Sequence, residues 1–304
     1  MPKLVALTGA SGFIGSALIQ ELIHDGWKVR ALTRYDSYSC NESLEWIKGD
    51  LDNLTALYHL VNDAAFVIHC AATVKGSSFQ EFEHINIEGT KNLLSVTLNQ
   101  TQRPRFLYLS SLAARQPELS WYAQSKYLSE RQFHHYSNLL QWTIFRPTAV
   151  YGPGDKELKP LFQAMHRGIL PVFGNINNRF GLIHVHDLVA AIRAWLNTPV
   201  TVNQTFELDD GMPNGYSYEE LAVLAQKVWK RPVRCIQIPD LLMRSIAFLN
   251  LRLSQVLHYS PMLTPGKVNE LQHNNWVCDN APLRDAIPNW QPKIRLHDVL
   301  PEVI

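Results

Sequence analysis

The segment "SWYAQSKYLSERQ", residues 120–132, places a tyrosine and a lysine four positions apart. In a helix, side chains at this spacing lie one above the other on the same face. Tyr122 is a weak base at neutral pH, with an ordinary pKa of about 10, and a nearby ammonium such as that of Lys126 lowers this pKa by stabilising the phenolate. The pair could therefore accept or donate a proton, although the spacing alone is also common on solvated helix surfaces.

Two serines, Ser110 and Ser111, end a predicted strand shortly before this helix. Ligands of open α/β sheets bind at the carboxyl ends of the strands. A serine hydroxyl at that edge can hold a carbonyl or alcohol oxygen in line with the tyrosine, while a nicotinamide supplies or takes the hydride. These residue types, in this order, contain every part needed to interconvert a ketone and an alcohol.

A glycine-rich turn, "TGASGFIG", lies between the first predicted strand and the first predicted helix. A tight turn, a bare backbone and close helix–strand packing at its three glycines are typical of a dinucleotide-binding turn. The helix N-terminus adds free N–H groups and a positive dipole for a pyrophosphate. The candidate cofactor site begins with the residues of this turn and helix start: Gly9, Ser11, Gly12, Phe13, Ile14 and Gly15.

The second predicted strand ends in "ALTRYD". The guanidinium of Arg34 suits a 2′-phosphate because its forked donors bind oxygens in pairs. NADP(H) is therefore favoured over NAD(H), with Asp36 keeping the NAD(H) alternative open. In "GDL", Asp50 and Leu51 lie where they could reach the adenine, although an aspartate after a strand is common in loops.

The first half alternates apolar strand-like runs with helical patterns, which predicts an α/β Rossmann-type doubly wound parallel sheet. Six predicted strands are "KLVALTG", "WKVRALT", "LEWIKGD", "AAFVIHCAA", "PRFLYLSS" and "QWTIFRP". After Pro147, loops rich in Gly, Pro and Asn precede a smaller, partly interleaved substrate domain. We expect residues 1–150 to form the dinucleotide-binding domain, with 179–210 returning to it, and residues 151–178 and 211–304 to form the substrate domain.

Bulk composition narrows the class of protein. The 304 residues are 46% hydrophobic and 18% charged, with a formal net charge of +1 and no basic stripe, which argues against nucleic acid as a partner. Four scattered cysteines indicate neither a metal site nor a disulfide framework. The N-terminus enters a strand at once and no apolar stretch is long enough to span a bilayer, so we expect a cytoplasmic protein.

Seven ordered motifs give the chain its resemblance to a known family: "TGASGFIG", "VIHCAA", "NIEGTKNLL", "YLSSLAA", "YAQSK", "FRPTAVYGPGD" and "LIHVHDLVAAI". The chain resembles an extended short-chain dehydrogenase/reductase of the NAD-dependent epimerase/dehydratase superfamily. The resemblance implies a catalytic triad of Ser111, Tyr122 and Lys126, with Ser110 a weaker candidate and Lys126 also holding the nicotinamide ribose. It further implies that His69, Cys70, Ala71 and Ala72 line the cofactor cleft, that Pro147 lies against the nicotinamide, and that Asn86 is either structural or part of a proton relay.

Two departures from the family pattern bear on the substrate. The loop from Ser111 to Tyr122 is short, which predicts a differently shaped substrate mouth, and it lacks the Asp-Glu pair that sugar dehydratases carry after the catalytic serine or threonine. We therefore expect an oxidoreductase acting on a ketone or secondary alcohol, more apolar or lipid-like than a sugar nucleotide. The alternatives are a nucleotide-sugar epimerase with tightly bound NAD and a non-catalytic NADP-sensing protein.

The second half carries four further features. Residues 241–257 predict a helix with an apolar stripe, for which a core-facing helix is the simplest interpretation and a substrate lid or peripheral membrane contact the alternatives. Ser217 and Glu220 predict a capping box. Arg179 is either a diphosphate ligand or a solvated residue, and we expect Asp187 of "IHVHDL" to cap a helix rather than bind a metal. The resemblance allows a homodimer. The stripe consists of Leu242, Ile246, Leu249, Leu253 and Leu257.

Overall fold

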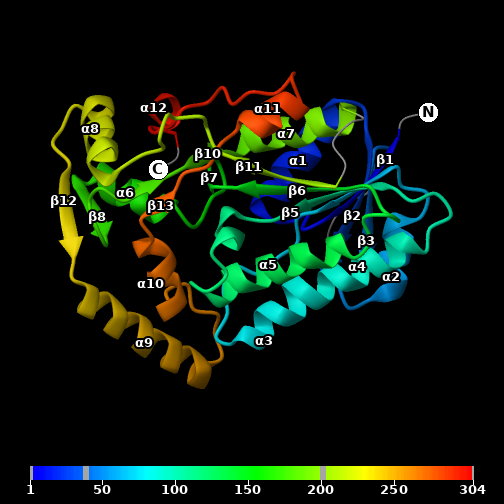
Figure 1. The fold of residues 1–304 in the computed structure, drawn as a ribbon, viewed down its shortest axis with the longest axis horizontal. Coiled ribbons are helices and arrows are strands. Elements are labelled where there is room, and N and C mark those ends of the chain that lie inside the picture. The colour runs from blue at the N-terminus through cyan, green and yellow to red at the C-terminus, as the bar shows by residue number, and fades with distance from the viewer. Residues whose placement is uncertain (1–2, 37–40, 199–202, 303–304) are drawn as a thin grey trace.

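Seven parallel strands form the central sheet of the protein (Figure 1). The structure is a computed structural model that describes residues 3–36, 41–198 and 203–302, so Cys40 lies outside the described residues. The sheet order is β11-β6-β5-β4-β1-β2-β3, which confirms the predicted Rossmann-type doubly wound fold. The strands are β1 (Leu4–Thr8), β2 (Lys28–Thr33), β3 (Leu44–Lys48), β4 (Phe66–His69), β5 (Arg105–Leu109), β6 (Trp142–Pro147) and β11 (Gln204–Leu208).

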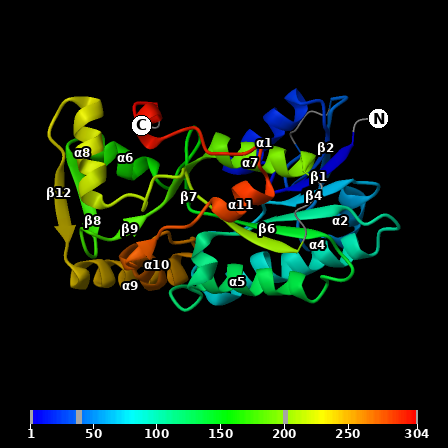
Figure 2. The same cartoon turned by 45° about the horizontal axis from the view of Figure 1, so that its top comes forward.

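Helices cover both faces of this sheet (Figures 1 and 2). Side chains alternate along a strand, so Val5 and Leu7 of β1 pack into one apolar cluster and Ala6 into the other. Burial on both faces explains why the strands are apolar without alternation. One face is covered by α1 (Phe13–His24), α7 (Val185–Asn197) and α11 (Ala281–Ala286), and the other by α2 (Leu54–Val61), α4 (Gly89–Leu98) and α5 (Trp121–His134).

Apart from the short α3 (Phe79–Phe82), which contacts α5, the remaining α-helices and strands form a smaller part beside the carboxyl ends of the strands (Figure 1). It has an apolar core of its own, built around Tyr151, Phe162 and Leu221. Three two-stranded parallel pairs join β7 (Ala149–Tyr151) to β10 (Leu182–His184), β8 (Ile169–Phe173) to β12 (Arg234–Ile238), and β9 (Arg179–Phe180) to β13 (Asn275–Trp276). Its helices are α6 (Lys159–His166), α8 (Tyr218–Trp229), α9 (Asp240–Leu257), α10 (Pro265–Gln272) and α12 (Leu296–Val299).

The chain passes between the two parts more than once. After β9 and β10, α7 packs against α1 and β11 pairs with β6 at the edge of the large sheet. The exact domain boundaries stay a prediction. At the start of α8 the predicted capping box is confirmed, since the Ser217 side chain accepts from the Glu220 N–H and the Glu220 side chain accepts from the Ser217 N–H.

The apolar stripe of helix α9 does not face the core, as its simplest interpretation predicted. Its buried residues are Met243, Ala247 and Ser254, and the first two pack against Val268 of α10. The predicted apolar stripe instead points to solvent, with side chains such as Leu249 and Leu257 more than half exposed. The core-facing interpretation is therefore wrong. Small side chains let one side of the helix pack closely, while the larger apolar ones remain outside.

Candidate active site

A cavity of about 1170 Å³ lies between the large sheet and the smaller part. From the sheet side it is lined by loop residues at the carboxyl ends of β4 and β5 and by the start of α5. From the other side it is lined mainly by apolar residues of the smaller part, including Phe162, Phe173 and Leu221. Because parallel strands end at one edge, residues as far apart in the sequence as Phe13 and Pro147 meet here.

Ser111 and Tyr122 come together at the wall of this cavity. Ser111 follows β5 and caps a single 3-10 turn, Leu112–Arg115, by accepting from the Ala113 N–H at 3.2 Å. Tyr122 lies in the first turn of α5, which begins where the Ser120 side chain accepts from the Ala123 N–H at 3.0 Å. Burial raises the pKa of Tyr122, and a side-chain hydrogen bond with Ser111 offsets part of that rise. A proton on the Tyr122 hydroxyl is therefore held beside a serine oxygen.

Lys126 lies one turn further along α5 and is buried. Its Nζ donates to the Leu109 carbonyl at 2.8 Å and lies 4.3 Å from the centre of the Tyr108 ring. Burial lowers the pKa of Lys126 to about 7, although the charge of Glu130 partly opposes this. The amine thus points back to the end of β5, where it also lines the cavity.

A charged pair on α10, Lys267 and Glu270, also acts on Tyr122. Lys267 of α10 lines the cavity, and its charge lowers the pKa of Tyr122, whereas that of Glu270 raises it. Lys267 Nζ donates to Glu270 Oε2 at 2.8 Å, and this ion pair raises the pKa of Lys267 even though burial lowers it. Glu270 also accepts from Ser120, the cap of α5. The sequence did not predict this pair, and the effect of Lys126 on the Tyr122 pKa stays a prediction.

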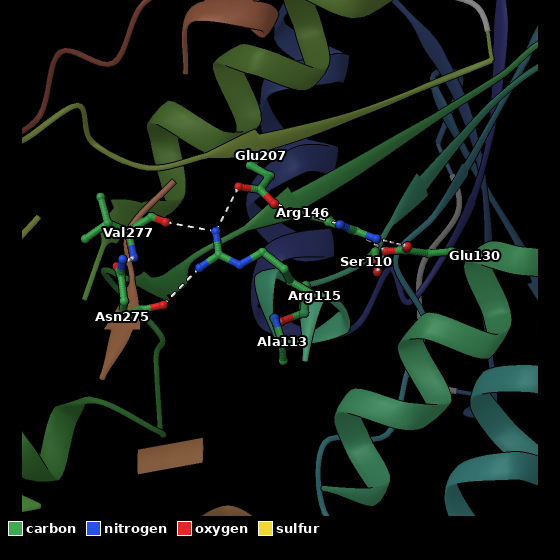
Figure 3. A network of polar contacts seen from close by, with 9 residues as sticks. Ser110, Ala113, Arg115, Glu130, Arg146, Glu207, Asn275 and Val277 are labelled. Atoms are coloured by element: carbon green, nitrogen blue, oxygen red, sulfur yellow. Dashed lines mark hydrogen bonds and ion pairs between the residues drawn. The ribbon is translucent and has the colours of Figure 1, made fainter. Parts of the chain in front are cut away.

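Ser110 has a different environment from Ser111. It is buried, and its hydroxyl donates to Glu130 Oε1 at 2.5 Å (Figure 3). Glu130 also accepts from Arg146 at 2.9 and 2.5 Å. Because its hydroxyl is bonded to Glu130, Ser110 stabilises the end of β5. Ser111 is the serine that bonds to Tyr122.

The Glu130–Arg146 pair belongs to a longer polar network that crosses to the smaller part (Figure 3). Arg146 Nη1 lies 3.8 Å from Glu207 of β11, and Arg115 Nη1 lies 3.3 Å from the same carboxylate. Arg115 also donates to the carbonyls of Asn275 and Val277, at 2.9 and 3.0 Å. Sequence reasoning missed this network, although Glu130 continues the four-residue spacing of Tyr122 and Lys126.

The glycine-rich turn fits a dinucleotide phosphate. Gly9 has a φ of +69°, and a Cβ there would lie 2.6 Å from the Ala71 nitrogen, while a Cβ on Gly15 would meet the backbone of Gly9 and Ala10. The first turn of α1 has no side-chain cap, and Gly12 before it is exposed. Its N–H groups are thus open to an anion, as a pyrophosphate requires.

The other predicted cofactor residues fall into three groups. Phe13, Ile14, Cys70, Ala72 and Pro147 line the cavity. Ser11 is exposed in the turn, and the Ala71 N–H donates to Thr8 Oγ1 at 3.3 Å beside it. His69 does not line the cleft: it is fully buried, both ring nitrogens bond to Thr8 and Thr90 hydroxyls, and burial lowers its pKa to about 3.

At the end of β2 the two candidate ribose partners differ. Asp36 is paired with Lys48 at 2.6 Å. Arg34 is exposed and makes no hydrogen bond or ion pair with other residues in the described part of the chain. Asp50 Oδ1 accepts from the Asp52 and Asn53 N–H groups, and Leu51 is buried against Gly89.

Asn86 lies in a π-helical turn, Glu83–Glu88, a geometry that often marks functional sites. Its amide accepts from the Thr73 N–H at 2.8 Å and donates to the Thr73 carbonyl and to Ser125 Oγ, at 3.0 and 2.8 Å. In this π-helical segment the Asn86 carbonyl accepts from the hydroxyls of Thr90 and Ser129. Asn86 thus ties the loop at the cavity rim to α5, which favours its structural role.

The polar residues of the second half have structural partners. Arg179 pairs with Glu220 at 2.9 Å and donates to the Asn214 carbonyl. Asp187 accepts from the Lys293 and Ile294 N–H groups, and His184, not Asp187, caps α7. This corrects the predicted cap. Within the described ranges, no cluster of three or more His, Cys, Asp or Glu is placed to hold a metal ion.

Comparisons with known proteins agree with this architecture. Residues 5–208 match the model of the NAD dependent epimerase/dehydratase family. The chain is 34% identical to a ceramide reductase of Caulobacter vibrioides (strain NA1000 / CB15N), over 94% of this chain and 89% of that protein. It is 28% identical to a UDP-glucose 4-epimerase of Vibrio cholerae, over 77% and 79%.

A solved UDP-glucose 4-epimerase from Thermotoga maritima, with UDP-glucose, has the same fold with a TM-score of 0.73. It is 19% identical and covers 99% of this chain and 97% of its own. The extent of the family match, together with the relatives, shows that the protein is an oxidoreductase that belongs to the NAD-dependent epimerase/dehydratase family.

Proposed function

We propose that this protein interconverts a ketone and a secondary alcohol on an apolar, lipid-like substrate, with NADP(H) as its preferred cofactor. The observation that carries the proposal is the composition of the cavity. The hydroxyls of Ser111 and Tyr122 lie at one wall, and the smaller part provides a wall that is mainly apolar. The name of the Caulobacter relative, ceramide reductase, supports a substrate of this class.

The roles of the polar residues follow from their contacts. Tyr122 holds a proton within hydrogen-bond reach of Ser111, so it can protonate an oxygen bound between them or take a proton from it. Ser111 orients and polarises that oxygen. The hydrogen bond from Ser111 makes the Tyr122 phenolate less costly, and the charge of Lys267 adds to this effect while Glu270 opposes it.

The cofactor site would be formed by the glycine-rich turn and the edge of the sheet. Gly9, Gly12 and Gly15 would hold the pyrophosphate, and Lys126 would hold the nicotinamide ribose beside Pro147. When bound, the nicotinamide supplies or accepts the hydride. The Arg34 guanidinium has no partner among the residues that the structure describes, and Asp36 next to it is already paired with Lys48. This arrangement supports a preference for the 2′-phosphate of NADP(H).

A nucleotide-sugar epimerase with tightly bound NAD is the second candidate, favoured by the Vibrio cholerae relative. Two observations count against it. Arg179, the candidate diphosphate ligand, is held by Glu220 and by backbone carbonyls. The wall that would face a sugar is mostly apolar.

Oxidation of NADPH in the presence of long-chain ketones tests the proposal against this alternative. We expect turnover of an apolar ketone, and greater thermal stabilisation by NADPH than by NADH. Arg34→Ser should reduce the preference for NADPH about tenfold, because it removes a charge-assisted contact. Epimerisation of UDP-glucose without ketone reduction, by a protein that purifies with NAD, would contradict the proposal.

A further inference from the structure

Helix α9 exposes an apolar face that no part of the described protein covers. Six side chains, with exposed fractions from 47% to 74%, follow one side of the helix. A contiguous exposed patch of large apolar side chains usually marks an interaction surface. In Figures 1 and 2 the helix runs along the outer edge of the smaller part, with α10 beside it. We call this set the α9 face: Leu242, Ile246, Leu249, Leu253, Val256 and Leu257.

Past Asp240, which begins α9, the charged side chains of the helix have one sign. The chain contains no aspartate or glutamate from residue 241 to residue 269. Arg244 is paired with Asp240 just before this stretch, but Arg252 meets no carboxylate in the described structure: it bonds to Gln255, and its guanidinium lies over Phe248. An apolar face flanked by arginine and free of carboxylates is complementary to anionic lipid headgroups.

The opposite side of α9 and the loop after the helix contribute to the cavity. Leu251 of α9 lines the cavity, as do Pro261 and Met262 in the loop that follows, and Met262 is also exposed. At the other side of the mouth, the Ser77 carbonyl accepts from Gln255 of α9 at 3.2 Å. An apolar chain leaving the cavity past Met262 would therefore emerge beside the α9 face.

We propose that the α9 face lies in the interface of a bilayer that contains anionic lipid, so that a lipid substrate enters the cavity directly from the membrane. The entry of a lipid substrate from the membrane rests on the proposed function, because that function supplies the lipid-like substrate. The contact is peripheral, since no helix among the described residues has the length and apolarity to cross a bilayer.

A second copy of the chain suits the α9 face less well. In a two-fold dimer the same patch meets itself. The arginine of each copy would then face a surface that contributes no carboxylate between residues 241 and 269, and like charges brought together oppose association. Anionic headgroups, by contrast, supply the missing negative charge.

Sedimentation with vesicles tests the inference on the full chain. Vesicles made of equal parts phosphatidylglycerol and phosphatidylcholine should bind the wild type more tightly than pure phosphatidylcholine vesicles. The double variant Leu249→Glu/Leu253→Glu should lose at least about tenfold in partitioning, because it places carboxylates in the interface. Arg252→Gln should reduce the preference for the anionic vesicles. Val223→Glu, on the exposed side of α8, is the matched control and should bind as the wild type does.

Three results would overturn the inference: no sedimentation of the wild type, equal binding by the double variant, or a wild-type dimer in light scattering that the double variant dissociates. Reduction of a short, water-soluble ketone should be unchanged in the folded double variant, since neither leucine lines the cavity as described. If the wild type binds vesicles but reduces no ketone, the proposed function fails and the membrane surface stands.

Discussion

The two walls of the cavity are built in different ways. On the sheet side, polar groups are fixed by partners: Lys126 by the Leu109 carbonyl, Ser110 by Glu130, and Ser111 by Tyr122 and the Ala113 N–H. On the other side, apolar side chains predominate, and the same part of the chain carries the exposed α9 face. Under the proposed function, the sheet wall performs the chemistry and the apolar wall selects the substrate.

Tyr122→Phe should have the largest effect, because it removes the proposed proton donor from the sheet wall. The change removes the hydroxyl that holds the proton beside Ser111 and leaves the apolar wall intact. We expect kcat/KM for ketone reduction to fall by about 10³-fold or more, with the NADPH dissociation constant changed less than about twofold. Steady-state kinetics and fluorescence titration measure the two quantities.

Tyr127→Phe is the matched control, since Tyr127 lies on the same helix and does not line the described cavity. Turnover by Tyr122→Phe at the wild-type rate would show that another group transfers the proton.

Glu130→Gln should destabilise the polar network that holds the end of the sheet wall. Glu130 is buried and bonds to both Arg146 and Ser110, so its neutralisation leaves the Arg146 charge with only the more distant Glu207. We expect the free energy of unfolding to fall by about 2–3 kcal/mol in urea denaturation. Glu45→Gln, at an exposed pair with Arg30, should cost less than about 1 kcal/mol. Equal losses for the two variants would show that the network is not the support we infer.

Apart from the loss of the proposed ribose contact, Lys126→Met should change how stability depends on pH, and this change is the smallest effect that we expect. Burial lowers the pKa of Lys126 from 10.5 to about 7. Between these values the unfolded chain binds more protons on this residue than the folded chain, so the free energy of unfolding rises with pH. The variant should lose this contribution, which is at most about 1.4 kcal/mol per pH unit.

Urea denaturation of the cofactor-free protein at several values between pH 7 and 10 measures that slope. Parallel slopes for wild type and Lys126→Met would mean that the folded lysine titrates near its ordinary pKa.

The sequence predicted the sheet wall better than the apolar wall. The glycine-rich turn and the strand ends depend on local patterns, and each lies where those patterns predict. The network of Glu130, Arg146 and Glu207 was missed because its members come from α5, β6 and β11, and only strand order brings them together.

The apolar wall depends on packing that periodicity does not encode. The stripe of α9 was recognised, but its direction follows from the contact of Ala247 and Met243 with α10, which leaves the leucines outside. Lys267 and Glu270 were missed for a similar reason. Their ion pair reaches Tyr122 only because α10 begins against Ser120, where a Cβ on Gly266 would lie 2.9 Å from the Ser120 Cβ.

The central claim is that the apolar wall selects a lipid-like ketone for the chemistry of the sheet wall. Its most direct test is kcat/KM with NADPH for a series of ketones that differ only in alkyl chain length. Each methylene buried against the apolar wall should raise kcat/KM by roughly three- to fourfold until the cavity is filled. A value independent of chain length, together with turnover of UDP-glucose, would contradict the account.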